Sequence, residues 1–332
     1  MAVYTEVSDD ELREFMGEYD IGEVVSIKGI AEGVENSNYL LQTVTEADAR
    51  PQSYILTLYE KRVAPEELPY FLGLMDHLAD GGFSCPTPIH GRDGAALRTL
   101  SGRPAAIVSF LPGMWPRKVT PQHCAELGAA MARLHLAGAD FEGHRDNNMS
   151  VSGWEKLVAA TRDRADEVVP GLSGTIVDEL AHIGQHWPSD LPQGVIHADL
   201  FPDNVFFLGD RLSGLIDFYF ACNDALTYDI AICINAWCFE ADASLNITKA
   251  RALLRGYARV RKLSRDEYDA IPALARGAAL RFLLTRLYDW LNHDEAAFVR
   301  PKDPRQFLDR LRFHQQVDGP EAYGISFDDL NG

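Results

Sequence analysis

Cysteine is scarce in this 332-residue chain, which has five cysteines and no pair of them separated by only two residues. An odd number without such pairs disfavours a disulfide framework and favours a reducing compartment, so we expect a cytoplasmic protein. The first residues, MAVYTEVSDDELREF, carry no basic segment followed by an apolar one, so we expect no secretory signal. No run of about 18 apolar residues is present, which predicts no membrane-spanning helix.

Positive charge is also in deficit. The chain has 31 Lys and Arg against 49 Asp and Glu, a formal net charge of −18 at pH 7. Such a surface repels a phosphate backbone, so we expect neither nucleic acid nor an anionic membrane as a partner. With 46% hydrophobic and 24% charged residues the composition is that of a globular protein, and the length predicts one or two domains. For the assembled state we expect a monomer or a homodimer.

The N-terminal third combines strand patterns with one main helix pattern. Ser8 and Glu11 have the spacing of a capping box, which predicts a short helix after Ser8. Apolar residues at helical spacing predict a second helix over 65–80. Strands are predicted at 23–30, 38–44, 53–59, 94–100 and 104–110. The pattern is typical of an α+β lobe of about five strands.

A boundary is predicted near residue 112, where Leu111-Pro112-Gly113 breaks the strand pattern. The lobes would therefore comprise 1–112 and 113–332. The second is predicted to be mostly helical, with helices at 121–138, 153–168, 174–187, 248–261, 266–294 and 304–316. Residues 194–220 are the exception, because they contain a polar loop followed by two strand patterns around Gly209-Asp210-Arg211, which predicts a hairpin.

This exceptional segment holds the residues with the most specific spacing. His197 and Asp199 form a His-x-Asp triplet, and Asn204 follows the Asp by five residues. After the predicted hairpin comes Asp217, followed by Phe218, with Tyr219 in the place where protein kinases have Gly. Together they match the catalytic loop and the magnesium-binding Asp of kinases. Two alternatives stay open. Asp199 and Asp203 could simply form a turn while Asp217 ends a strand, or the protein could be a metal-dependent hydrolase with His197 and Asp199 as ligands.

Phosphoryl transfer to an alcohol explains why these residue types are present. Asp199 can accept the proton that the alcohol loses as its oxygen attacks. Asn204 and Asp217 offer the hard oxygen ligands that Mg²⁺ prefers, and Mg²⁺ neutralises the phosphates of ATP. His197 would hold the loop by hydrogen bonds. The segment therefore predicts an ATP- and Mg²⁺-dependent kinase.

Several stretches resemble the aminoglycoside phosphotransferase and choline kinase-like superfamily. They are VIHADLFPDNVFF with the following GLIDFYFACND and LTYDIA, and GIAEGVENSNYLL, YILTLYEKR, CPTPI, RPAAIVSFLPG, LGAAMARLH and RFLLTRLYDWL. They are most similar to its bacterial homoserine kinase branch. The resemblance implies a two-lobed, protein-kinase-like α+β fold. The N-terminal lobe, 1–112, would be an antiparallel sheet with one main helix that binds nucleotide. The larger, mostly helical lobe, 113–332, would bind substrate and catalyse the reaction.

The resemblance also implies roles for single residues. Asp229, within YDIA, would anchor a helix. The residues implied to meet the nucleotide lie in the loop between the first two strands, on the third strand and in the hinge: Gly33, Asn36, Ser37, Asn38, Thr57, Ser109 and Leu111. Thr57 departs from the kinase pattern, which has a Lys or Arg there, so the metal or another basic residue such as Lys61 or Arg62 would carry more of the phosphate charge.

For the acceptor, the homoserine kinase resemblance implies phosphorylation of the hydroxyl of L-homoserine, a step of threonine biosynthesis. A homoserine site needs an Arg for the carboxylate, and Arg281 and Arg286 are available in a largely apolar helical run. Together with Asp199 they are the residues that we expect to contact the substrate. Choline, an aminoglycoside or methylthioribose stay open as alternative acceptors, because a fold does not fix a substrate. A pseudokinase that binds nucleotide without turnover is a further alternative.

Overall fold

The computed structural model describes residues 5–30, 36–48, 50–60, 64–293 and 300–331. They form two compact units, Met1–Pro112 and Gly113–Gly332. Among these residues no helix combines the length and the apolar character that crossing a membrane requires. The mixture of a five-stranded antiparallel sheet with many helices confirms the predicted α+β class.

The first unit is built on an antiparallel sheet with strand order β1-β2-β3-β5-β4. Its strands are β1 Glu23–Gly29, β2 Ser37–Val44, β3 Gln52–Leu58, β4 Arg98–Leu100 and β5 Arg103–Ser109. The five predicted strands are present, but the fourth is shorter than predicted. Its expected first residues, 94–97, lie outside the strand because Gly94, at φ +82°, closes a turn in which the N–H of Gly91 donates to Ala95.

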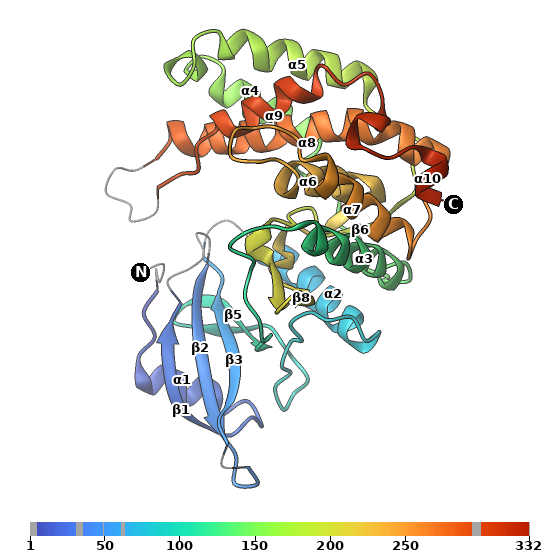
Figure 1. The fold of residues 1–332 in the computed structure, drawn as a ribbon. Coiled ribbons are helices and arrows are strands. Elements are labelled where there is room, and N and C mark those ends of the chain that lie inside the picture. Colours follow the sequence, from blue (N-terminus) through green and yellow to red (C-terminus); the bar gives the residue numbers. More distant parts are fainter. Residues whose placement is uncertain (1–4, 31–35, 49, 61–63, 294–299, 332) are drawn as a thin grey trace. The chain divides into compact units, whose positions relative to one another are not determined.

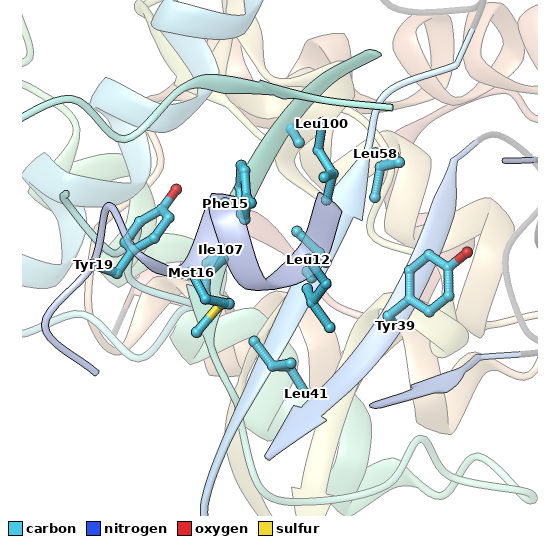
Figure 2. Packing of buried hydrophobic residues seen from close by; sticks show 11 residues of the cluster. Leu12, Phe15, Met16, Tyr19, Tyr39, Leu41, Leu58, Leu100 and Ile107 are labelled. Carbon is cyan, nitrogen blue, oxygen red and sulfur yellow. The ribbon is translucent and has the colours of Figure 1, made fainter. Parts of the chain in front are cut away.

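The core of this unit joins a helix to the sheet. The predicted capping box of Ser8 and Glu11 is formed and starts α1 (Asp9–Met16). Buried residues of this helix, among them Leu12 and Phe15, pack against sheet residues such as Leu41 (Figure 2). Strand β2 alternates buried and half-buried residues, so one of its faces supplies this core. A second helix, α2 (Leu68–Asp80), follows the 3₁₀ turn Pro65–Glu67.

The second unit is mainly helical (Figure 1). Its helices are α3 Pro121–Ala137, α4 Val151–Thr161, α5 Leu172–His186, α6 Leu226–Trp237, α7 Ile247–Ala258, α8 Arg265–Leu291, α9 Arg305–His314 and α10 Phe327–Asn331. The long helix α8 packs against α4, α5, α6 and α9. Helices α3 and α7 approach closely at Gly128, which has no side chain. A Cβ there would lie 2.1 Å from the carbonyl oxygen of Leu253.

Two short antiparallel pairs lie among these helices. Strands β7 (Val205–Leu208) and β8 (Arg211–Leu215) form the hairpin that the sequence predicts. Strand β6 (Gln193–Ile196) pairs with β9 (Cys222–Ala225), a pairing that was not predicted. The β6–β9 pair brackets the segment from His197 to Asp217, and the β7–β8 hairpin lies within it.

Helix α6 was missed by the sequence analysis. Eleven of its twelve residues are buried, so the helix has no exposed polar face. A helix that is buried on all sides shows little alternation of apolar and polar residues, and periodicity cannot separate it from a buried strand. The omission matters, because α6 carries Tyr228 and Asp229.

Candidate active site

The loop after β6 is held by one buried carboxylate. Asp229, on α6, accepts the backbone N–H of His197 and that of Ala198, each at 2.8 Å. Ala198 has φ +62°, a left-handed conformation that L-residues other than Gly seldom adopt. On its other side the carboxylate lies 3.1 Å from Nε2 of His135, on α3. Asp229 therefore links the strained loop to a neighbouring helix.

The charge of Asp229 is maintained despite complete burial. Burial acts to raise its pKa, but the hydrogen bonds that it accepts from His135 and from the backbone N–H of His197 help to outweigh burial, so the pKa lies below its usual value. His135 Nδ1 in turn lies 2.8 Å from the hydroxyl of Tyr257 on α7. A buried carboxylate that keeps its charge is a strong acceptor for the loop N–H groups.

His197 adopts one tautomer within this loop. Its Nε2 donates to the carbonyl of Ile216 at 3.0 Å, and its Nδ1 accepts the N–H of Asp199 at 3.3 Å. The ring is fully buried, and burial lowers its pKa, which favours the neutral ring that this pattern requires. The hydrogen bonds match the loop-holding role predicted for His197.

Asp199 and Asn204 contact each other directly. The side-chain amide of Asn204 donates to the carbonyl of Asp199 at 2.8 Å and to its carboxylate Oδ2 at 3.1 Å. Because the nitrogen is used in this way, the amide oxygen of Asn204 is turned to the other side. That oxygen is the atom a metal would need.

Asp217 is brought to the same place by its neighbour Ile216. The N–H of Ile216 donates to the backbone carbonyl of Asn204 at 3.0 Å, and its own carbonyl accepts from His197. Asp217 then turns the chain with φ +65° into the 3₁₀ turn Phe218–Phe220. The structure thus brings Asp199, Asn204 and Asp217 together in one hydrogen-bonded segment.

The electrostatic surroundings of Asp199 favour proton uptake. Burial raises its pKa well above the usual value, and the carboxylates of Asp217 and Asp203 act in the same direction. Arg281 and Lys302 oppose them. A carboxylate with a raised pKa accepts a proton more readily near neutral pH, as a general base requires.

The oxygen atoms of this segment suit a hard cation. Asn204 and Asp217 provide an amide oxygen and a carboxylate, which fit Mg²⁺ better than the sulfur and nitrogen ligands of zinc sites. Within the described ranges, no three His, Cys, Asp or Glu side chains gather to form a metal site of their own. Two protein ligands match the usual Mg²⁺ site of phosphoryl transfer, in which phosphate and water complete the coordination.

The predicted nucleotide residues lie in the first unit, except Gly33, which falls outside the described residues, as do Lys61 and Arg62. The hydroxyl of Thr57 donates to the side-chain oxygen of Asn38 at 2.8 Å, across the β2–β3 pair. The buried hydroxyl of Ser37 donates to Glu60 at 2.6 Å. These side chains hold the two strands together.

Further residues of this group also make local hydrogen bonds. Asn36 accepts the N–H of Glu60 at 3.3 Å, and Ser109, at the end of β5, accepts the N–H of Thr87 at 2.9 Å. Leu111 follows two residues later and is partly exposed.

The two candidate substrate arginines differ in their surroundings. Arg286 donates from Nη1 to the carbonyl of Asp303 at 3.3 Å and to the side chain of Gln306 at 3.0 Å. Its guanidinium also lies over the ring of Phe307 at 4.5 Å, and burial lowers its pKa to about 10. Arg281 is buried, and its charge lowers the pKa of Asp199. Arg286 is therefore bonded to the start of α9, although Asp203 and Asp199 also act on its pKa, while Arg281 is the strongest influence that lowers the pKa of Asp199.

Sequence reasoning assigned Asp229 to anchoring a helix and did not identify His135 or Tyr228. Asp229 contacts helix α3 through His135, and it also anchors the loop before Asp199, through His197 and Ala198. The sequence did contain a signal for this role, because an Asp within an apolar helical stretch is expected to be buried, and a buried charge needs strong hydrogen-bond partners.

The chain resembles known phosphotransferases along most of its length. A family model described as "Phosphotransferase enzyme family" matches residues 26–263. The homoserine kinase of Paramagnetospirillum magneticum is 66% identical, covering 98% of this chain and 100% of the relative. The homoserine kinase of Parvibaculum lavamentivorans is 62% identical, with 98% and 99% covered.

Solved structures with this fold include several small-molecule kinases. An amicoumacin kinase in complex with AMP-PNP, Ca²⁺ and Ami has a TM-score of 0.70 at 14% identity, with 97% of each chain covered. Choline kinase from Cryptosporidium parvum has a TM-score of 0.66 at 15% identity, with 93% of this chain and 95% of that chain covered. At these identities the likeness establishes the fold.

Proposed function

Because this chain belongs to the phosphotransferase enzyme family, and within it to the homoserine kinases, we propose that it transfers the γ-phosphoryl group of ATP to the side-chain hydroxyl of L-homoserine. The product would be O-phospho-L-homoserine, an intermediate of threonine biosynthesis. The observation that carries the proposal is the hydrogen-bonded segment in which Asn204 contacts Asp199 and Ile216 brings Asp217 alongside.

Asp199 is the proposed general base. Its carboxylate accepts the proton of the homoserine hydroxyl as that oxygen forms a bond to the γ-phosphorus and the bond to the ADP oxygen breaks. The Asn204 amide, which donates to Asp199 Oδ2, fixes the orientation of the carboxylate. Because Asp229 and His197 immobilise the loop backbone, little reorganisation is needed at the moment of reaction.

Asn204 and Asp217 are the proposed Mg²⁺ ligands. Mg²⁺ held by their oxygen atoms would neutralise charge on the ATP phosphates. Kinases carry a Lys on the third strand that also neutralises phosphate charge, and here that position is the uncharged Thr57. We therefore expect the reaction to depend strongly on the metal.

The two units would divide the binding tasks. The first unit, 1–112, would bind nucleotide through the loop before β2 and through residues 109–111, and the second unit would bind homoserine and catalyse the transfer. Of the two arginines, we assign substrate contact to Arg281, because Arg286 is bonded to the start of α9. A cytoplasmic location fits an enzyme that consumes ATP, and either a monomer or a homodimer is compatible with this assignment.

A coupled assay of ADP release tests the proposal. Wild type with ATP and Mg²⁺ should be stimulated by L-homoserine, and Asp199→Asn should lose about 10²- to 10⁴-fold in kcat while still binding nucleotide. Choline, an aminoglycoside and methylthioribose serve as competing acceptors in parallel reactions. Stimulation by one of these and none by homoserine would refute the substrate, and no turnover with any acceptor would refute the kinase itself.

A further inference from the structure

Arg281 is a buried cation with unused donors. The side chain lies on α8 and is 2% exposed. Among the described residues, its buried Nε and Nη1 atoms find no hydrogen-bond partner. The guanidinium lies 4.7 Å from the ring centroid of Phe282 and 6.0 Å from that of Phe220. Aromatic faces compensate only part of the cost of burying a cation, so an anion is needed to complete its surroundings.

Tyr228 presents a second unused donor from the neighbouring helix. It lies on α6, which packs against α8, and its side chain is fully buried. Its ring packs edge-on against Trp187 at 5.6 Å, which holds the ring in place. In the described part of the chain that hydroxyl has no acceptor, and the one group that interacts closely with it is the Arg281 guanidinium, itself a donor. Buried tyrosine hydroxyls usually have a partner, so this exception calls for one.

The guanidinium of Arg281 influences both the Tyr228 hydroxyl and the Asp199 carboxylate. Burial raises the pKa of the Tyr228 hydroxyl, and the guanidinium of Arg281 is the strongest influence that lowers it. The same guanidinium is the strongest influence that lowers the pKa of Asp199. Two N–H groups of an arginine and one O–H group therefore lie within electrostatic reach of each other and of the catalytic carboxylate.

The catalytic loop itself contacts this region. The ring of Phe201, two residues after Asp199, packs edge-on against Phe282 at 4.8 Å. Phe282 follows Arg281 on α8, so the position of the guanidinium is coupled to the loop that carries the base. An anionic group bound by Arg281 would place an attached hydroxyl in the neighbourhood of Asp199.

On the basis of the proposed function, we propose that Arg281 and Tyr228 together bind the α-carboxylate of the substrate and make the enzyme select hydroxy-amino acids over amino alcohols of the same length. A planar carboxylate matches the fork of a guanidinium, and its second oxygen has lone pairs for the phenol. Without the carboxylate, the three buried donors would remain unpaired, which is the strongest basis for rejecting an analogue.

Two homoserine analogues separate this role from catalysis. 3-Aminopropan-1-ol lacks only the carboxylate, and 4-hydroxybutanoate lacks only the amine. We expect wild type to prefer homoserine over the amino alcohol by about 10³-fold in kcat/KM. Arg281→Met should reduce this preference by about 10²-fold, because kcat/KM falls much further for homoserine, chiefly through KM, than for the amino alcohol. With 4-hydroxybutanoate the loss should be as large as with homoserine.

Tyr228→Phe is the milder variant. It should reduce the preference for homoserine by about tenfold. Because the hydroxyl has no acceptor within the described residues, the variant should be at least as stable as wild type, which keeps the test valid if Arg281→Met folds poorly. Tyr323→Phe is the matched control, since its hydroxyl lies 2.9 Å from Nδ1 of His314 and its removal should leave the preference unchanged.

The outcomes are distinguishable. Equal losses with homoserine and 3-aminopropan-1-ol in Arg281→Met would place Arg281 on the phosphates or on the base and overturn the inference, while homoserine phosphorylation by wild type stands. An unchanged preference in both variants would overturn it as well. If wild type phosphorylates neither compound, the proposed function fails first.

Discussion

Asp229 holds Ala198 in a left-handed conformation: its Oδ1 accepts the N–H of Ala198 at 2.8 Å, and Ala198 has φ +62°. Such a conformation costs about 1–2 kcal/mol for an L-residue with a Cβ. The next residue is Asp199, so the direction of the catalytic carboxylate depends on this strained peptide. We therefore predict that Asp229 is a positioning residue, which acts on the reaction through the loop.

Asp229→Asn should therefore impair catalysis without weakening nucleotide binding. An Asn offers one oxygen where the loop needs two acceptors, so one loop N–H group would face an amide NH₂. We expect kcat to fall about a hundredfold and the free energy of unfolding to fall by about 3 kcal/mol. Steady-state kinetics, nucleotide titration and urea unfolding measure the three effects, and hydrogen exchange at residues 197 and 198 reports on the loop itself.

The matched control is Asp163→Asn, which removes an 87% exposed carboxylate. It should change none of the three quantities. A normal kcat in Asp229→Asn, or faster loop exchange without any change in kcat, would contradict the positioning role.

Asn204→Ala should change the metal requirement of the enzyme. The variant removes the amide oxygen assigned to Mg²⁺ and the amide nitrogen that orients Asp199. We expect the Mg²⁺ concentration for half-maximal activity to rise about 10- to 100-fold. Asp163→Asn, which removes an exposed carboxylate elsewhere in the second unit, serves as the control. Rates measured across a Mg²⁺ titration give both values, and equal half-maximal concentrations in Asn204→Ala and wild type would exclude Asn204 as a ligand.

The local geometry of the segment from His197 to Asp217 could be predicted from the sequence because its spacing is local. His197, Asp199 and Asn204 lie within eight residues, and a hairpin with Gly209 at its turn returns the chain to Asp217. Loop and hairpin chemistry act over such distances, so the spacing encodes the geometry. The capping box of Ser8 and Glu11 was predictable for the same reason.

What anchors this segment could not be predicted in the same way. Asp229 is 32 positions from His197, and His135 is 94 positions from Asp229, so neither contact leaves a pattern in a short window. Arg281 and Arg286 are similar in sequence, and they differ because Asp303 and Gln306 pair with Arg286. Such distinctions arise from tertiary packing.

Acid should destabilise the second unit through His314. The ring is fully buried between the hydroxyl of Tyr323 and the side chain of Asn235, and burial, helped by the charges of Arg310 and Arg276, lowers its pKa to about 3. The unfolded chain takes up a proton near the ordinary value of about 6.5, whereas the folded chain does not until about pH 3. Stability therefore falls as the pH is lowered through this window, by roughly 1.4 kcal/mol per pH unit.

His314→Gln removes this proton uptake. The variant should be less stable at pH 7.5, because the paired ring is lost, but its stability should fall less steeply between pH 6.5 and 4. All five tryptophans lie in 113–332, so urea unfolding followed by tryptophan fluorescence reports on this unit. Parallel pH profiles for variant and wild type would show that His314 does not carry the effect.

Gly128→Ala should separate helices α3 and α7. A Cβ at this position would lie 2.1 Å from the carbonyl oxygen of Leu253 and 2.8 Å from the backbone nitrogen of Tyr257, so backbone has to move. We expect a loss of about 1–3 kcal/mol in the free energy of unfolding. Since α3 carries His135, kcat should fall as well, with nucleotide affinity unchanged.

Gly184→Ala supplies the contrast on helix α5. A Cβ there has no heavy atom within 4 Å among the described residues, so only helix propensity acts, and the variant should gain up to about 1 kcal/mol. Thermal and urea unfolding of the two variants beside wild type measure the opposite signs. If Gly128→Ala were as stable as Gly184→Ala, the close approach of α3 and α7 would be wrong, and the support of the catalytic loop through His135 would have to be explained in another way.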